Sequence, residues 1–245
     1  MGLAVIADIH GNLPALEAVI ADIARRNVDH TINLGDCVSG PLWPRETMDL
    51  LERLKLQTVR GNHDRWVAQT PRERMYPSDA FAHDAITPLQ RSALGALPPV
   101  CKLDTGITAV HGTSIDDNQY LLEDVFHGRL VLARPTTICD RLNGQSRGLF
   151  LCGHSHLPRI VHAANGALIV NPGSVGCPAY SDPNPPAHVS ESGSPHARYA
   201  LLSQSAGVWS IDLIGIEYDW NAASVRAAEN GRADWARALA SGFMG

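Results

Sequence analysis

Five short polar clusters along the chain contain side chains that can bind metal ions or transfer protons. They are Asp8-Ile9-His10, Gly35-Asp36, Gly61-Asn62-His63-Asp64, His111-Gly112 and Gly153-His154-Ser155-His156. Each is a weak signal by itself, because an Asp after a strand is more often a helix cap or turn residue and a lone His is more often a hydrogen-bonded interior residue. Together, the clusters offer two carboxylates, four imidazoles and an amide as ligands. That set is about what two divalent ions require once water and substrate complete their coordination.

The mixture of ligand types indicates which metals such a site would hold. Imidazole and carboxylate together suit Mn, Fe, Ni, Co or Zn and suit Mg or Ca poorly. Two divalent ions carry four positive charges, of which Asp8, Asp36 and a bridging hydroxide would cancel about three. The remaining positive charge would attract a phosphate ester, so the clusters predict phosphoryl chemistry.

The segments that precede the first three clusters have the pattern of buried strands alternating with helices. Short apolar runs at residues 3–7, 31–34 and 57–59 each end at a polar cluster. Between them, Asn12 is a candidate N-cap before apolar residues at helical spacing, and residues 45–54 present a second apolar helix face. This alternation predicts a parallel sheet with right-handed crossovers. The polar clusters would therefore meet at the carboxyl edge of that sheet.

The second half of the chain predicts shorter and more closely spaced strands. Residues 78–97, and later 219–229 and 232–240, have helical patterns. Strands are expected at residues 107–110, 148–152, 160–162 and 167–170, with a late hairpin at 199–203 and 207–214. This spacing with short turns indicates a second sheet, mixed or antiparallel.

Residues 177–197 contain five prolines and several serines, with neither a helical nor a strand pattern. We expect a long loop in which His188 and His196 are solvated. Our hypothesis is that this loop folds over the metal site and restricts which substrates enter it.

The order and spacing of the five clusters resemble the calcineurin-like metallophosphoesterase superfamily, whose pattern is D-x-H, GD, GNH(D/E), H and GHxH. Residues 171–175 (Asn-Pro-Gly-Ser-Val) and 198–202 (Arg-Tyr-Ala-Leu-Leu) also resemble the small bacterial and archaeal YfcE-type phosphodiesterase branch. The resemblance covers most of residues 3–240. It implies an α/β fold, a four-layer αββα sandwich in which two packed mixed β-sheets are flanked by helices. The whole chain, 1–245, would be one domain with a helical cap-like segment at about 78–97 and the Pro-rich loop at about 177–197.

The resemblance also implies which residues bind metal and which act on the substrate. The metal ligands would form two sets that share a bridging Asp36: Asp8, His10, Asp36 and His156 for one ion, and Asp36, Asn62, His111 and His154 for the other. Manganese is the expected metal, with Fe, Ni, Zn or Co as alternatives. A hydroxide that bridges the ions would attack phosphorus while His63, as general acid, protonates the leaving oxygen. Asp64 would orient His63.

The function expected from these residues is metal-dependent hydrolysis of a small phosphodiester. A diester is favoured because the sequence offers a single candidate general acid and no evident cluster that would recognise a monoester dianion. The open alternatives are a phosphomonoesterase or phosphoprotein phosphatase, a dinucleoside polyphosphate hydrolase and, more remotely, a non-catalytic metal-binding scaffold. A degenerate scaffold would be expected to lose ligands or the acid histidine, and here the set is complete.

Composition excludes several other classes of protein. The 245 residues carry a net charge of -5, which argues against dedicated nucleic-acid binding. No apolar run is long enough to cross a membrane, and the N-terminal apolar stretch has no basic flank and contains Asp8, unlike a signal peptide. The five cysteines are scattered without a CxxC spacing, as in reduced intracellular proteins. We therefore expect a cytoplasmic enzyme, with a homodimer as the default assembly.

Overall fold

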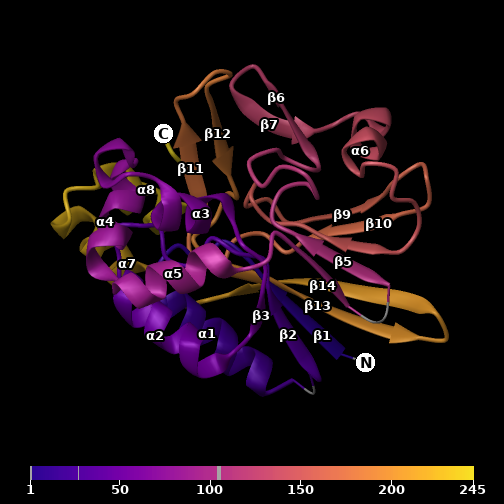
Figure 1. Cartoon of the computed structure of the whole chain (residues 1–245), viewed down its shortest axis with the longest axis horizontal. Coiled ribbons are helices and arrows are strands. Elements are labelled where there is room, and N and C mark those ends of the chain that lie inside the picture. The colour runs from indigo at the N-terminus through magenta and orange to yellow at the C-terminus, as the bar shows by residue number, and fades with distance from the viewer. Residues whose placement is uncertain (1, 27, 104–105) are drawn as a thin grey trace.

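The structure is a computed structural model that describes residues 2–26, 28–103 and 106–245, and their strands form three sheets (Figure 1). The first sheet contains β1 (Gly2–Ile6), β2 (His30–Asn33), β3 (Gln57–Thr58), β13 (Ala197–Ser205) and β14 (Val208–Ile216), in the order β14-β13-β1-β2-β3. Strands β1, β2 and β3 are parallel, as predicted. The predicted late hairpin, β13 and β14, pairs antiparallel with β1 and so extends this first sheet rather than the second.

The second sheet is mixed, as the spacing of the later strands predicts. It contains β4 (Val100–Leu103), β5 (Ile107–Val110), β8 (Leu149–Leu151), β9 (Arg159–His162) and β10 (Leu168–Asn171), in the order β4-β5-β8-β10-β9. The three inner strands are parallel and the two outer strands are antiparallel to them.

A third sheet was not predicted from the sequence. It contains β6 (Glu123–Phe126), β7 (Arg129–Leu132), β11 (Ala179–Asp182) and β12 (His188–Glu191), in the order β11-β12-β7-β6. The prediction that residues 177–197 form a loop without strands is therefore wrong. Strands β11 and β12 form a hairpin, and three of the prolines lie in its turn, where they remove no ladder hydrogen bond. His188 is buried and His196 is half-buried, so neither is freely solvated.

The helices are α1 (Leu13–Ala24), α2 (Pro44–Leu54), α3 (Asn62–Gln69), α4 (Pro77–Ala85), α5 (Pro88–Ala96), α6 (Pro135–Arg141), α7 (Trp220–Glu229) and α8 (Ala233–Ser241), with a 3-10 turn at Arg72–Arg74. The segment predicted as helical at 78–97 is thus two helices. They are separated at Thr87, whose side chain caps α5 by accepting from the backbone N–H of Gln90.

Alternating side chains of the strands produce the four layers. On β1, Leu3 and Val5 pack against Ile107 and other residues of the second sheet, whereas Ala4 and Ile6 pack against α1. On the far face of the second sheet, Phe150 and Ile169 pack with α6. The order helix, sheet, sheet, helix confirms the predicted sandwich (Figure 1).

The remaining helices lie to one side of the two sheets (Figure 1). Helices α2 to α5 share an apolar cluster that contains Met48, Val67 and Leu94. Helices α7 and α8 pack on each other and α8 reaches β11, while the backbone N–H of Met244 donates to Glu191 on β12. Helix α8 and the residues after it therefore lie beside the third sheet.

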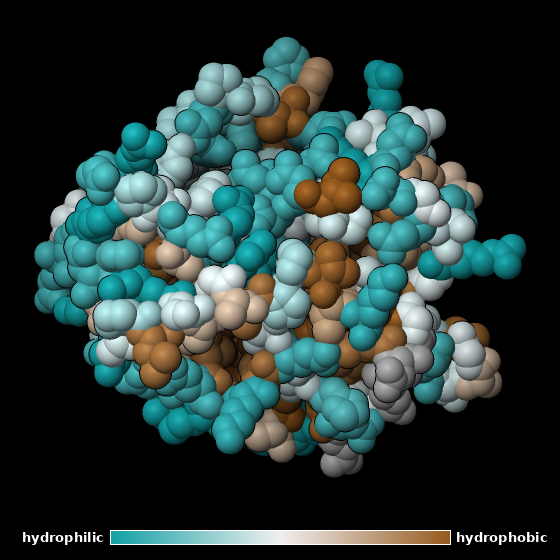
Figure 2. Space-filling view, in the orientation of Figure 1, coloured by the Kyte–Doolittle hydropathy of each residue, from teal (hydrophilic) through white to brown (hydrophobic). Residues whose placement is uncertain are grey.

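On the face shown in Figure 2, the apolar side chains lie in small separate groups. None of the helices in the described part of the chain combines the length and the hydrophobicity that a membrane span requires.

Candidate metal centre and active site

The parallel strands of both packed sheets end beside one another and deliver the polar clusters to one place. Asp8 lies two residues beyond β1, Asp36 three residues beyond β2, and Asn62 begins α3 after β3. His111 follows β5 directly, and His154 follows β8. The structure brings together all of the predicted ligands, and most of them are buried: Asp8, His10, Asp36, Asn62, His111 and His156.

The backbone at these clusters adopts an unusual conformation. In the described part of the chain ten residues other than glycine have positive φ, and five of them are predicted ligands: Asp8, His10, Asp36, His154 and His156. A left-handed conformation is disfavoured for residues with a Cβ, and it concentrates at functional sites. The turns after the strands are thus shaped to aim side chains inward.

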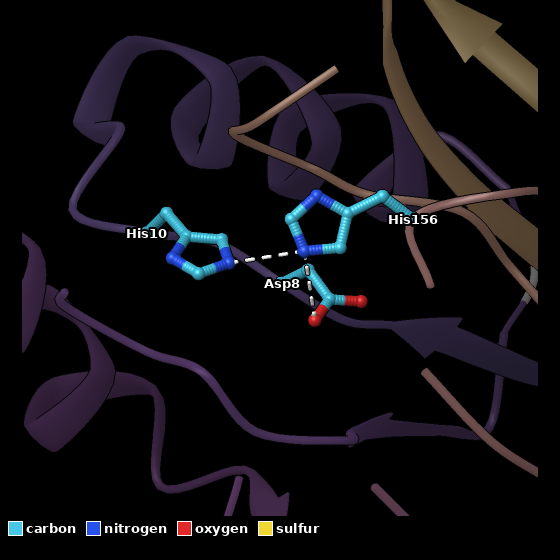
Figure 3. Close-up of side chains that lie close together, drawn as sticks. All are labelled: Asp8, His10 and His156. Atoms are coloured by element: carbon cyan, nitrogen blue, oxygen red, sulfur yellow. Dashed lines mark hydrogen bonds and ion pairs between the residues drawn. The ribbon is translucent and has the colours of Figure 1, made fainter. Parts of the chain in front are cut away.

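Asp8, His10 and His156 form the first group of convergent ligand atoms (Figure 3). The Nε2 atoms of His10 and His156 lie 3.1 Å apart, and His156 Nε2 lies 3.4 Å from Asp8 Oδ1. Two ligand atoms that each lie about 2.1 Å from one ion are separated by roughly 3–3.5 Å. The group therefore has the spacing of a metal site.

Asp36, His111 and His154 form the second group. His111 Nε2 lies 3.3 Å from Asp36 Oδ2, and the same oxygen lies 3.7 Å from His10 Nε2 in the first group. The other Asp36 oxygen, Oδ1, accepts a hydrogen bond of 2.9 Å from the backbone N–H of His63. One oxygen of Asp36 is thus fixed by the backbone, and the other lies between the two groups.

Backbone carbonyls set which nitrogen of each imidazole faces the centre. Nδ1 of His10, His111 and His156 lies 2.6–2.8 Å from the carbonyl oxygens of Ser39, Leu34 and Cys177. Such a carbonyl requires a protonated Nδ1, which leaves the lone pair on Nε2. In His154 the arrangement is reversed, because Nε2 lies 3.1 Å from the carbonyl oxygen of Asn118. Each of the four imidazoles thus has one nitrogen held by a backbone carbonyl and the other directed to the centre.

Three buried polar atoms at the centre have no hydrogen-bond partner: Asp36 Oδ2, Asn62 Oδ1 and His111 Nε2. A buried polar atom without a partner costs about 1–3 kcal/mol, so such atoms are rare unless a ligand satisfies them. These atoms belong to the set predicted for the second ion. The residues present therefore fit divalent metal ions.

Burial and mutual charge shift the pKa values of these histidines in opposite directions. Burial lowers the pKa of His10 to about 4 and that of His154 to about 3. Burial also opposes protonation of His111, but the carboxylates of Asp36 and Asp8 outweigh it and raise the pKa to about 9. The two carboxylates therefore attract positive charge into the centre.

Asp64 does not orient His63, contrary to the sequence prediction. Its carboxylate accepts hydrogen bonds of 2.9 Å from the backbone N–H groups of Asp36, Cys37 and Gly61. Burial and the Asp36 charge raise its pKa to about 6. Asp64 thus joins the loop after β2 to the start of α3. The two loops are so close that a Cβ at Gly61 would overlap the Asp36 carboxylate.

Asp79 of α4 occupies the position expected for Asp64. Its Oδ1 lies 2.7 Å from His63 Nδ1 and also accepts a 2.7 Å hydrogen bond from the Ser39 hydroxyl. Burial would lower the pKa of His63, but the charges of Asp79 and Asp36 outweigh it and raise the pKa to about 9. Asp79 was not predicted from the sequence, because it follows Pro77 in the first turn of a helix, where an acidic residue is ordinary.

A cavity of about 330 Å³ opens at the centre. Its walls include His10, Asp36, His63 and His154, the α8 residues Asp234 and Trp235, and Ala179 to Asn184 of the β11–β12 hairpin. The Pro-rich segment therefore borders the site, as the hypothesis on residues 177–197 requires. Two further wall residues that the sequence analysis missed are Tyr120 and Tyr180, which stack on or contact the rings of His154 and His156.

Comparison with known proteins agrees with this geometry. A model of the calcineurin-like phosphoesterase superfamily domain matches residues 1–190. The uncharacterized protein MJ0912 of Methanocaldococcus jannaschii is 26% identical over 256 residues, covering 95% of this chain and 94% of that protein. The crystal structure of a metallophosphoesterase from Sphaerobacter thermophilus has 24% identity, covers 99% of each chain and superimposes with a TM-score of 0.75. The hypothetical protein PH1004 of Pyrococcus horikoshii has 19% identity, covers 100% of this chain and 99% of its own, and has a TM-score of 0.78.

The chain belongs to the calcineurin-like phosphoesterase superfamily, because the family model spans more than half of it. The family predicted from the five clusters is confirmed. Membership supports a hydrolase that depends on metal, and the chain carries two His/Asp groups suited to metal ions.

Proposed function

We propose that this protein hydrolyses phosphodiesters at a centre of two divalent ions. The observation that carries the proposal is the position of Asp36 Oδ2, which is buried without a hydrogen bond between two groups of imidazole and carboxylate ligands. Asp8, His10 and His156 would hold one ion, and Asn62, His111 and His154 the other, with Asp36 shared. When bound, such ions supply Lewis acidity to phosphoryl oxygens and make water a stronger nucleophile at neutral pH.

His63 would act on the leaving group. Because Asp79 engages Nδ1, Nε2 is the nitrogen left to face a substrate in the cavity. As the water oxygen bonds to phosphorus and releases a proton to solvent, the bond from phosphorus to the leaving oxygen would break and His63 Nε2 would give its proton to that oxygen. Asp79 would keep the imidazole in the required tautomer and orientation.

The charge of the cavity favours a diester over a monoester. A monoester dianion needs an additional cation, and Arg232 is the one guanidinium among the described residues that line the cavity. Arg232 is already committed, since Nε and Nη2 bond both oxygens of Asp234 at 2.9 and 2.7 Å and Nη1 bonds the Ser78 hydroxyl at 2.8 Å.

Manganese is the metal that we propose first, because the imidazole and carboxylate ligands suit a first-row ion. The cytoplasmic location and the homodimer stay predictions.

The test uses protein stripped with a chelator and restored separately with Mn, Ni, Zn or Mg. Bis(p-nitrophenyl) phosphate is assayed beside p-nitrophenyl phosphate, with Asp36→Ala and His63→Ala as variants. We expect metal-restored diester turnover that is lost in Asp36→Ala. Turnover of the monoester alone would favour a phosphatase, and no turnover despite two bound ions would favour a scaffold.

A further inference from the structure

The cavity at the metal centre shares lining residues with a second, larger and more open cavity of about 1060 Å³. We call the 330 Å³ cavity the inner chamber and the larger one the outer chamber. Six residues line both and so mark the passage between them: Trp66, Tyr76, Asn118, Tyr120, Asp182 and Asn184. Half of these residues are aromatic. The inner chamber alone takes two of the chain's five tryptophans and three of its five tyrosines.

Trp66 connects the passage to the chemistry. Its ring meets the ring of His63 edge to face, with centroids 4.8 Å apart and an interplanar angle of 79°. Tyr76 extends the aromatic surface outward, with its centroid 5.8 Å from that of Trp66. If His63 protonates the leaving oxygen, the organic arm on that oxygen would lie next to Trp66, on the side of the cavity that faces the outer chamber.

The opposite wall of the passage is held rigid. The Tyr120 hydroxyl lies 2.7 Å from both the Tyr180 hydroxyl and His188 Nε2. His188 Nδ1 lies 2.8 Å from the carbonyl oxygen of Pro186 and must donate to it, so Nε2 accepts from Tyr120. The Tyr120 ring stacks on His154 at a centroid distance of 4.6 Å and 25°. A ring that enters the passage therefore meets fixed aromatic walls.

The outer chamber disfavours an anionic arm. Its described lining carries four carboxylates (Asp116, Glu123, Asp124 and Asp182) against two guanidinium groups (Arg134 and Arg141). Two of these carboxylates are paired, Asp124 with Arg141 at 2.7 Å and Glu123 with Arg159 at 2.8 Å. Asp116 and Asp182 then remain against Arg134. Apolar side chains, among them Phe126 and Leu132, complete the wall. A second phosphate in this chamber would face net negative charge.

The geometry points to a specific substrate class: a phosphodiester whose leaving arm contains an aromatic ring and carries no negative charge, with Trp66 and Tyr76 as the residues that select that arm. This inference rests on the proposed function, and it excludes polyphosphate chains as preferred substrates.

The test compares three methyl phosphate diesters that differ only in the leaving arm: benzyl, cyclohexylmethyl and 4-carboxybenzyl. Product alcohols are measured with manganese-loaded protein. We expect kcat/KM for benzyl to exceed that for cyclohexylmethyl by about 2- to 12-fold, the range for aromatic pairing beyond burial. We expect 4-carboxybenzyl to be the poorest of the three. Trp66→Leu and the surface variant Tyr76→Leu should each reduce the preference for benzyl, whereas Trp209→Leu, on β14 outside both chambers, should keep it.

Equal rates for benzyl and cyclohexylmethyl, or a preference for the carboxylated arm, would overturn the inference while leaving diester hydrolysis intact. If the protein hydrolyses none of the diesters, including bis(p-nitrophenyl) phosphate, the proposed function fails instead. Calorimetry of benzyl methyl phosphate and cyclohexylmethyl methyl phosphate binding would then still measure the aromatic preference, and equal affinities would overturn it. Tyr76 is 48% exposed, so its variant is expected to fold even if Trp66→Leu does not.

Discussion

Replacing Asp79 by Asn tests whether Asp79 positions His63, because the substitution leaves all of the predicted metal ligands in place. The Asn side chain keeps the size of Asp79 but removes the charge that accepts from both His63 Nδ1 and Ser39, each at 2.7 Å. A hydrogen bond to a charged group contributes about 1.5–3 kcal/mol, which corresponds to roughly 10- to 150-fold in rate if it acts fully in the transition state. If His63 protonates the leaving oxygen, as we propose, this loss should appear only when the leaving group needs a proton.

The assay therefore uses two diesters, methyl p-nitrophenyl phosphate with a good leaving group and benzyl methyl phosphate with a poor one. We expect kcat to fall roughly 10- to 150-fold for the benzyl ester and to change less than about 3-fold for the p-nitrophenyl ester. The control is Asp84→Asn on the same helix, where the carboxylate is exposed and pairs with Arg72. Equal losses on both esters, or none, would refute the assignment of Asp79 as the residue that positions His63.

Three further predictions address the centre and the core. Gly61→Ala should weaken manganese binding about 10- to 100-fold by calorimetry, because a Cβ there displaces Asp36, whereas Gly245→Ala should not. Asp22→Asn should lower the free energy of unfolding in urea by about 1–3 kcal/mol at pH 7, since Asp22 accepts from the Tyr199 hydroxyl and Arg26. Burial would raise the pKa of Asp22, but these hydrogen bonds outweigh it and hold the pKa below its usual 3.8. The difference in unfolding free energy between the native protein and Asp22→Asn should therefore shrink as pH falls below that value. A difference that does not change with pH would contradict the reasoning. A chelator should lower the Tm of manganese-saturated protein by about 5–10 °C, and an unchanged Tm would argue against bound ions.

The sequence predicts those parts of the site that depend on where the strands end. Each predicted ligand follows a short apolar strand, and parallel strands end at one edge of a sheet, so the position of Asp8 or Asp36 follows from local pattern. The role assigned to Asp64 did not follow in this way. Residues 63 and 64 are adjacent in α3, and adjacent side chains of a helix point in different directions. Asp79 reaches His63 only because α4 packs on α3, which no local signal reports.

The third sheet was missed for a related reason. Its strands are four residues long, and the β11–β12 hairpin lies among five prolines. Proline disfavours a strand prediction because it cannot donate a backbone hydrogen bond. Here, however, the prolines at 183, 185 and 186 occupy the turn, so the paired residues of the two strands can form their hydrogen bonds. The aromatic passage depends on this hairpin and on the loop that carries Tyr120. The hydrogen bond between Tyr120 and Tyr180 joins residues that are 60 positions apart in the sequence, so no local pattern predicts it.

The most direct test of a two-ion centre is the anomalous scattering of crystals grown with manganese. Our account predicts two peaks per chain, about 3.5–4 Å apart. Asp36 Oδ2 should lie between them, with His10 and His156 on one side and His111 and His154 on the other. A single peak, or two peaks that leave Asp36 Oδ2 uncoordinated, would contradict the central claim.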